Sequence, residues 1–427
     1  MDKLTLLKRG IWLYFILLIF EGAIRRWVLP GFSNPLLVVR DILAIYLLFK
    51  AFQANNFPNH VFVSIMMWLG VVSIFIAIFL GHGNVWVALF GSRIFIIQFP
   101  MLFLIGGVFT KDDVLEMGKW FLILAIPMAA LVTLQFFSPQ SAWINKGIGE
   151  NIQAGFAGAN GYFRPPGTFS FITGLSSFFG LVAAFVFYFW LNTDKINRLL
   201  LLLSSFALLA AIPTSVSRTL FFECCISLLF FLCIQYAKPN FLRNMIQVFF
   251  GIVLVSILII NLPVLTVQIQ TLIARFENAN KSSEDGFQGA VIDRFFNGFT
   301  NAFEKMDSQY LLTGEGIGKG TNVGAQLLEG KVSFLVAEGE WGRLLGESGI
   351  IIGIIVIFFR VSMSINYTYA SFQRIRYGEY LPWMLSSYGL LHFLNTGWST
   401  ATSLGFYVLM GGLILASLKK EDELNSK

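Results

Sequence analysis

Four charged side chains lie together just before a long apolar run in the last third of the sequence. They are Glu338, Glu340, Arg343 and Glu347, and the apolar run begins at Ile350. Charges at the edge of a membrane span are costly unless they face protein or water, so they indicate a functional site. A carboxylate at such a place can take a proton from a hydroxyl group. The alternative is a helix start where acidic residues complement the positive end of the helix dipole.

Arginine is the prevailing charge in the segments that we expect on the outer side of a membrane. These residues are Arg93, Arg164, Arg218, Arg275, Arg294 and Arg343. A guanidinium group is always charged and offers a rigid fork of donors that suits phosphate. The pattern therefore predicts an outward cavity for a lipid-linked phosphate or diphosphate. The alternative is a scatter of exposed arginines that contact lipid headgroups.

Ionisable residues also lie within the outward halves of the expected spans. They are Glu21, Arg25, Arg26, Arg40, Asp41, Arg93, Arg218 and Glu223. One arginine facing lipid at mid-span costs on the order of 3 kcal/mol on insertion scales, so we expect the group to line an aqueous cavity. Two pairs, Arg40 with Asp41 and Glu21 with Arg25, have a structural ion pair as their alternative interpretation.

A glycine-rich segment, residues 311–321, lies in the same long polar region. It is not a phosphate-binding loop of the Walker type, because Gly320 stands where Ser or Thr would have to follow Lys319. It predicts a turn whose glycines, Gly316 and Gly318 among them, bring the backbone close to a ligand in the substrate cavity. A flexible turn is the alternative.

Composition assigns the chain to the polytopic membrane proteins. Only 13% of its 427 residues are charged, and 56% are hydrophobic, whereas soluble domains carry about 25% charged residues. The three cysteines fall in one apolar run, and the three histidines are scattered without metal-ligand spacing. We therefore expect no protein-held metal, no cofactor and no nucleic-acid partner.

Apolar runs of spanning length predict an all-α fold with about twelve transmembrane helices. The expected spans are 11–29, 34–50, 60–80, 85–108, 115–137, 169–191, 198–214, 219–237, 244–265, 341–360, 380–398 and 402–418. Three regions follow: spans one to nine in 1–265, a large outward loop in 266–340, and the last three spans with a cytoplasmic tail in 341–427. An apolar stripe from Phe287 to Phe303 predicts short helices within the loop.

Lysine and arginine in the short connections predict that both termini are cytoplasmic. With that orientation the following residues face the cytoplasm: Lys3, Lys8, Arg9, Lys50, Lys111, Lys195, Arg198, Lys238, Arg243, Arg360, Arg374, Arg376, Lys419 and Lys420. The opposite orientation would export all of them.

Four segments, taken in order, resemble the O-antigen ligase and O-antigen polymerase superfamily of bacterial surface polysaccharide assembly. They are residues 164–169 (RPPGTF), 214–219 (TSVSRT), 293–296 (DRFF) followed by 314–318 (GEGIG), and 344–351 (LLGESGII). Each motif alone is weak, and their order and placement carry the resemblance. The motifs cover about 164–353, and the topology covers the whole chain.

The resemblance implies a GT-C-like helical fold in the bacterial inner membrane and an inverting glycosyl transfer on its outer face. The donor would be a glycan on undecaprenyl diphosphate and the acceptor a glycan hydroxyl, without nucleotide sugar or metal. Arg164, Arg218 and Arg294 match family arginines that engage the diphosphate. Membrane lipid and, as an open alternative, a chain-length regulator protein are the further partners.

The chain departs from the ligases at one place. Ligases carry His-Asn where Glu338 and Gly339 stand here, so Glu338 becomes the candidate base, with Glu340 as the alternative. This difference favours a polymerase of O-antigen or exopolysaccharide repeat units over a ligase that transfers glycan to lipid A core. A transporter or flippase of a lipid-linked or anionic substrate, and a non-catalytic scaffold, are the alternatives from other classes.

Overall fold

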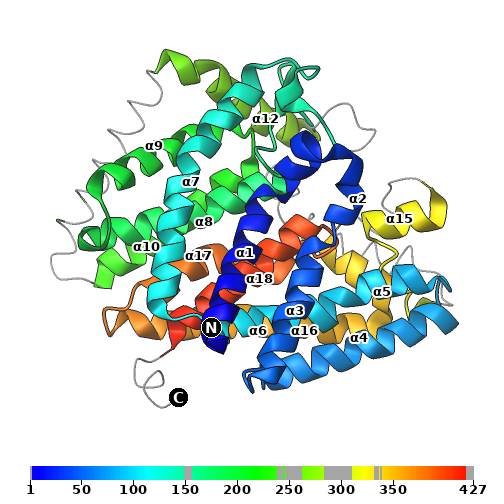
Figure 1. Ribbon diagram of the computed structural model, residues 1–427. Coiled ribbons are helices and arrows are strands. Elements are labelled where there is room, and N and C mark those ends of the chain that lie inside the picture. Colours follow the sequence, from blue (N-terminus) through cyan, green and yellow to red (C-terminus); the bar gives the residue numbers. More distant parts are fainter. Residues whose placement is uncertain are drawn as a thin grey trace.

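The computed structural model describes residues 2–148, 156–237, 262–282, 310–330 and 339–419, with residues 243, 246 and 336 between them. Helices make up most of these residues (Figure 1). The described β structure is one antiparallel hairpin of β1 (Phe156–Ala159) and β2 (Tyr162–Arg164). The expected all-helical class is therefore confirmed for the part of the chain that the structure describes.

Seven of the described helices are long and apolar enough to cross a membrane. They are α4 (Val61–Phe79), α5 (Val85–Arg93) continued through η3 (Ile94–Gln98) into α6 (Phe99–Val108), α7 (Lys111–Phe137), α8 (Ile172–Leu191), α10 (Arg218–Ala237), α16 (Glu340–Ile375) and α18 (Ala401–Leu418). These helices agree with the expected class of membrane protein.

Four further helices coincide with expected spans. They are α1 (Lys3–Ala23), which continues as the π-helix η1 (Ile24–Val28), α3 (Val39–Gln53), α9 (Arg198–Thr214) and α17 (Leu381–Asn395). Shorter or amphipathic elements complete the described chain: η2 (Pro30–Phe32), α2 (Ser33–Leu36), η4 (Trp143–Asn145), η5 (Thr193–Lys195), η6 (Pro263–Leu265), α12 (Thr266–Ser282) and α15 (Asn322–Glu329). Most of the expected span 244–265, and the apolar stripe from Phe287 to Phe303, lie outside the described residues.

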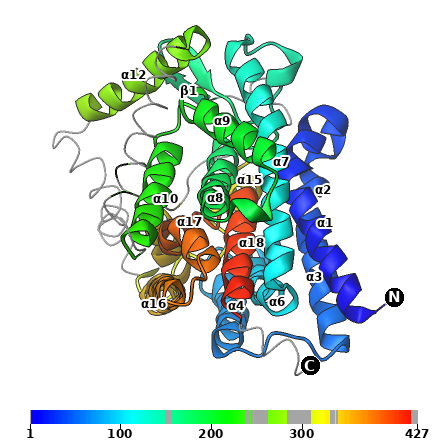
Figure 2. The same ribbon diagram turned by 90° about the vertical axis from the view of Figure 1, so that its left-hand side faces the viewer.

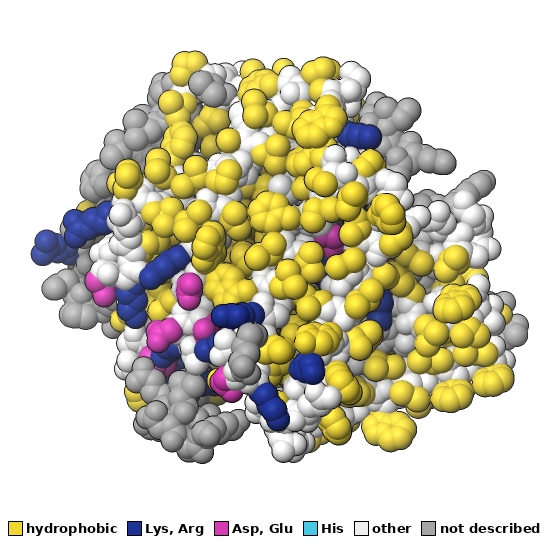
Figure 3. All heavy atoms as spheres, in the orientation of Figure 1, with side chains coloured by type: hydrophobic (Ala, Val, Ile, Leu, Met, Phe, Trp, Pro, Cys, Tyr) yellow, Lys and Arg dark blue, Asp and Glu magenta, His cyan; other side chains and the backbone are white. Residues whose placement is uncertain are grey.

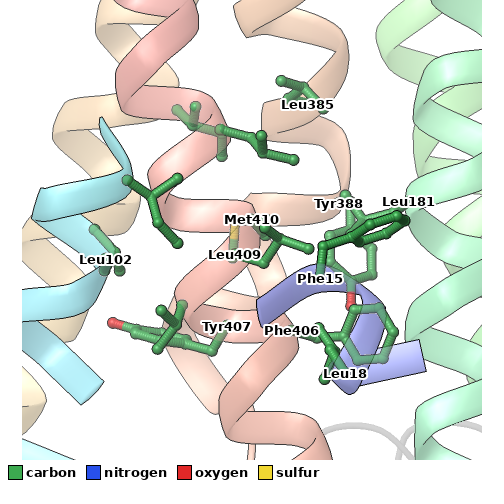
Figure 4. Close-up of a cluster of buried hydrophobic side chains, with 14 of the residues drawn as sticks. Phe15, Leu18, Leu102, Leu181, Leu385, Tyr388, Phe406, Tyr407, Leu409 and Met410 are labelled. Atoms are coloured by element: carbon green, nitrogen blue, oxygen red, sulfur yellow. The ribbon is translucent and has the colours of Figure 1, made fainter. Parts of the chain in front are cut away.

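Helix α18 forms the centre of the apolar core. Figure 2 shows it in the middle of the molecule, with α10 and α17 on one side and α1, α3 and α7 on the other. Its buried side chains meet residues from α1, α6, α8 and α17, such as Phe15, Leu102, Leu181 and Leu385 (Figure 4). At Gly411 an added Cβ would lie 2.4 Å from Leu102 Cδ1. Small residues of this kind let helices approach closely where apolar burial alone gives little driving force.

Charged side chains gather at the end where α1 begins. Figure 3 shows them at this end of a face that is otherwise largely apolar. Lys8 pairs with Asp113 at the start of α7 (2.6 Å), and Lys111 pairs with Glu379 just before α17 (2.6 Å). Lys419 donates to the carbonyl of Phe109 (3.0 Å). These contacts bring residues that we expect on the cytoplasmic side to one end of the bundle.

Helix α16 is broken near its start. Gly349 has φ 71° and ψ 176°, a conformation that is essentially limited to glycine. Arg360 Nη1 lies 2.8 Å from Glu340 Oε1, whereas twenty residues of straight helix span about 30 Å. Residues 340–348 therefore fold back along the helix that follows. The span expected at 341–360 thus lies within the longer apolar helix α16, whose break at Gly349 divides it. Arg360, expected on the cytoplasmic side of that span, is instead buried beside Glu340.

Replacing Gly349 by Ala is expected to destabilise the protein. The new Cβ would lie 2.1 Å from the carbonyl oxygen of Leu312 in a conformation that L-residues avoid, so we expect a loss of about 1–3 kcal/mol or more. Gly107→Ala is the matched control, because nothing lies within 4 Å of its added Cβ. Thermal unfolding in detergent should show a lower Tm for Gly349→Ala alone. Equal Tm values would contradict the sharp fold at Gly349.

Candidate functional site

The charged segment at the start of α16 forms a buried ion-pair network. Arg343 donates from Nη2 and Nε to the two oxygens of Glu340 (2.8 and 3.0 Å), and from Nη1 to Glu347 Oε2 (2.5 Å). Arg360 Nη1 donates to Glu340 Oε1 (2.8 Å). None of the four side chains is more than slightly exposed. Two guanidinium groups and two carboxylates together balance their charge, which is the condition for burying them.

This network gives Glu340 the role of an anchor. Both of its carboxylate oxygens accept hydrogen bonds from guanidinium groups, whereas a general base must present an oxygen to the hydroxyl that it deprotonates. The other candidate base, Glu338, lies outside the described residues. Arg343, which we placed in a substrate cavity, is likewise occupied by Glu340 and Glu347.

The glycine-rich turn is docked onto the same network. The N–H of Gly320 donates to Glu347 Oε1 (2.7 Å), and the N–H of Glu315 donates to the carbonyl of Gly346 (2.8 Å). Gly316 and Gly318 have φ of +107° and +94°, and a Cβ on Gly318 would lie 2.3 Å from the carbonyl oxygen of Val87. These two glycines allow the turn to pack between α5 and α16. The turn is therefore held by hydrogen bonds and close packing, and the interpretation of it as a flexible turn is wrong.

A second buried network joins α1, α3 and α5. Arg93 pairs with Asp41 (2.7 Å), and Arg40 pairs with Glu21 (2.7 Å). Arg25 also pairs with Glu21 (3.4 Å), in agreement with the alternative interpretation of these two residues as a structural ion pair. Asp41 therefore finds its partner in Arg93 on another helix and not in its neighbour Arg40. All these side chains are buried, so the outward cavity that we expected them to line is not what surrounds them, and Arg93 has a structural partner.

Residues 164–169 are clamped against α1 and α7. The carbonyl of Gly167 accepts hydrogen bonds from Arg26 and from Gln135 Nε2, and its N–H donates to Gln135 Oε1 (2.8 Å). Thr168 Oγ1 donates to the carbonyl of Ile19 (2.7 Å). This clamp fixes the end of the β-hairpin, and with it the backbone position of Arg164, which is half-buried.

The hairpin lies close to the turn that leads into Arg218. A Cβ added at Gly158 in β1 would lie 3.5 Å from Val216 Cγ1, and Arg275 Nη1 of α12 donates to the carbonyl of Gly158 (3.3 Å). Arg218 is the first residue of α10. The elements that carry Arg164, Arg218 and Arg275 are therefore neighbours, while Arg294 lies outside the described residues.

The connection between α17 and α18 ties these elements to the ion-pair networks. Arg360 Nη2 donates to the carbonyl of Thr396 (2.7 Å), and Arg40 Nη2 donates to the carbonyl of Ala401 (2.8 Å). Ser403 Oγ donates to Thr173 Oγ1 near the start of α8 (3.3 Å). The start of α8 and the connection 396–401 thus lie at one end of the bundle, together with both networks.

Three polar side chains that the sequence does not place together, Glu223, His392 and Thr396, form a hydrogen-bonded chain at this end. His392 Nε2 lies 2.8 Å from Glu223 Oε1 on α10, and His392 Nδ1 lies 2.5 Å from Thr396 Oγ1. In the sequence His392 is one of three scattered histidines without metal-ligand spacing. Its spacing of four residues from Thr396, which places both on one helix face, was the available signal. The pairing with Glu223 joins two distant helices and has no local signature.

Replacing Arg343 by Ala is expected to lower the free energy of unfolding by about 3–5 kcal/mol, because it leaves two buried carboxylates short of partners. Lys319→Ala is the matched control. Lys319 also pairs with a glutamate four residues away, Glu315, but that pair is partly exposed, so its loss should cost about 1 kcal/mol at most. Chemical denaturation in detergent measures both variants. Equal losses would contradict the assignment of Arg343 as a structural anchor.

His82 is expected to make docking of the glycine-rich turn sensitive to acid. Its Nδ1 accepts from the N–H of Asn84 (3.0 Å) and its Nε2 donates to the carbonyl of Ile317 (3.2 Å), so the ring must be neutral. Desolvation lowers the pKa of His82; the Ile317 carbonyl opposes this shift, and the charge of Lys319 adds to it.

Because the unfolded chain then binds this proton more readily than the folded chain, the contribution of His82 is full above about pH 6.5 and is lost as the pH falls below it. The Tm should fall between pH 7.5 and pH 5, and less steeply in His82→Gln. An identical slope in the variant would rule out this role for His82.

Comparison with known proteins leaves the family of this chain open. No family model matches the sequence, and no curated protein shows significant similarity to it. The resemblance to the O-antigen ligase and polymerase superfamily therefore depends on the quoted motifs and on their order along the chain.

Proposed function

We propose that this protein is a polymerase of O-antigen or exopolysaccharide repeat units in the bacterial inner membrane. The observation that carries the proposal is the closeness of the Arg164 hairpin to the turn before Arg218. Both lie at the end of the bundle opposite the start of α1, where Lys8 and Lys111 form their ion pairs (Figure 2). Two motifs that are separate in sequence thereby become neighbours. The proposal includes about twelve spans, a GT-C-like arrangement and cytoplasmic termini.

In this proposal the donor is a glycan on undecaprenyl diphosphate. Arg164, Arg218 and Arg294 bind the diphosphate and stabilise the negative charge that develops on it as the glycosyl bond breaks. The acceptor hydroxyl attacks the anomeric carbon from the opposite side, which inverts its configuration. Glu338 is the candidate base of the charged segment, since Glu340 is held by Arg343 and Arg360.

One observation favours a transporter or flippase as a second candidate function. The pair of Glu223 and His392 is an ionisable pair within the apolar helices, and such pairs form proton relays in pumps and transporters. A flippase would move the lipid-linked glycan without lengthening it, whereas a polymerase lengthens it. A ligase would lengthen nothing and would consume lipid A core as acceptor.

Arg218→Ala is expected to abolish formation of long products from purified lipid-linked repeat units, because the leaving diphosphate loses a stabilising charge. The loss should be about 10²-fold or more in rate. Arg198→Ala is the matched control: Arg198 is exposed and begins α9, whose other end leads to the turn before Arg218. Product length on gels, with the protein in lipid nanodiscs, is the measurement.

The outcomes separate the candidates. Unchanged chain-length ladders from a well-folded Arg218→Ala variant would contradict the proposal. Movement of unextended donor across vesicle membranes would support the flippase instead. Transfer of one glycan to added lipid A core, without lengthening in its absence, would support the ligase.

A further inference from the structure

We propose that Thr396, His392 and Glu223 form the proton-accepting chain for the acceptor hydroxyl, with His392 as the base. The inference rests on the proposed glycosyl transfer. Of the two candidate bases in the charged segment, Glu340 is bound by two arginines, and Glu338 lies outside the described residues. Among the described residues, Thr396, His392 and Glu223 form a hydrogen-bonded acid-base chain at the same end of the bundle, and in this inference His392 takes the place of Glu338 as the base.

The proposal takes Glu223 as ionised, and the hydrogen-bonding capacities of the three groups then fix the direction of the chain. The carboxylate can only accept, so His392 donates to it from Nε2, 2.8 Å away. The neutral ring then has an acceptor at Nδ1, and the hydroxyl of Thr396 donates to that nitrogen. A base that is held by a carboxylate on one side and receives a hydroxyl on the other is the general arrangement for activating an oxygen nucleophile.

The surroundings of His392 hold the ring in place. Its ring stacks on Tyr388 of the same helix with centroids 3.8 Å apart. Glu223 faces it from α10, and Arg360 of α16 approaches only the backbone carbonyl of Thr396. Cys224, the next residue after Glu223 on α10, is a further titratable group beside the chain.

In the proposed chain Thr396 receives the acceptor hydroxyl. Its neighbour Asn395 is exposed, the His392 side chain is 12% exposed, Thr396 is 8% exposed and Glu223 is 5% exposed. A Cβ added at Gly397 would meet no atom nearer than 3.9 Å, so the backbone beside Thr396 is loosely surrounded. Arg218 lies five residues before Glu223 on α10, a rise of about 7.5 Å along the helix.

The proton balance of the step is closed. The acceptor hydroxyl gives its proton to Thr396 Oγ1, while Thr396 passes its own proton to His392 Nδ1, and the imidazolium is stabilised by Glu223. The acceptor oxygen forms its bond to the anomeric carbon as the bond from that carbon to the diphosphate oxygen breaks. The electron pair leaves with the diphosphate, and His392 later returns its proton to water by the same path.

Substitutions at Thr396 distinguish this role from packing. Thr396→Val keeps the shape and removes the hydroxyl, and Thr396→Ser keeps the hydroxyl and removes a methyl group. We expect Val to lower kcat by about 10²-fold or more with little change in KM, and Ser to restore most of the rate. A packing role predicts the opposite order, and that order would overturn the proposal. Activity is measured with lipid-linked repeat units in nanodiscs.

The ring tautomer gives a readout that does not depend on activity. Nitrogen-15 NMR of the histidine side chains in the full chain, assigned with His60→Gln, His82→Gln and His392→Gln, should show the proton of His392 on Nε2. Thr396→Val should shift the Nδ1 resonance. A proton on Nδ1, as a protonated Glu223 would impose, overturns the proposal. If the wild-type protein extends no glycan, the proposed function fails. The NMR spectrum still shows, independently of activity, whether His392 carries its proton on Nε2 as the hydrogen-bonded chain requires.

Discussion

The bidentate pairing of Arg343 with Glu340, completed by Glu347, is the interaction on which the start of α16 and the glycine-rich turn depend. An unpaired charge in this interior would cost several kcal/mol. The pairing therefore dictates the fold at Gly349, because Glu340 must come back to reach Arg360. It also requires the close approach of the 314–320 turn, because the N–H of Gly320 in that turn donates to Glu347. Removing one charge would leave the others without balance.

The two buried networks share a common logic. One holds arginines and carboxylates from both sides of the break in α16, and the other holds them from α1, α3 and α5. Each is completed by a backbone carbonyl of residues 396–401. The arginines therefore act as braces between helices whose apolar surfaces alone would hold them weakly. Such bracing would give the glycosyl transfer that we propose a fixed site.

The sequence predicted the helices well, because each apolar run has a length and composition that only a helix can satisfy in lipid. It offered the pair of Glu21 and Arg25 as one of two interpretations, because the two residues are four apart in a helical segment. It did not predict the partner of Asp41, the return of Glu340 to Arg360, or the chain from Glu223 to Thr396. Each of these joins residues from different helices or across a backbone break, and neither periodicity nor local spacing carries that information.

The placement of Arg360 has a consequence for how the chain enters the membrane. Its guanidinium group is satisfied by Glu340, by the carbonyl of Phe393 and by the carbonyl of Thr396. The last two partners belong to α17 and its end, which are synthesised after α16. Until they arrive, the guanidinium group of Arg360 has only Glu340 of its own helix as a partner, and its remaining donors face an interior without water. We therefore expect α16 and α17 to leave the insertion machinery together, as one hairpin.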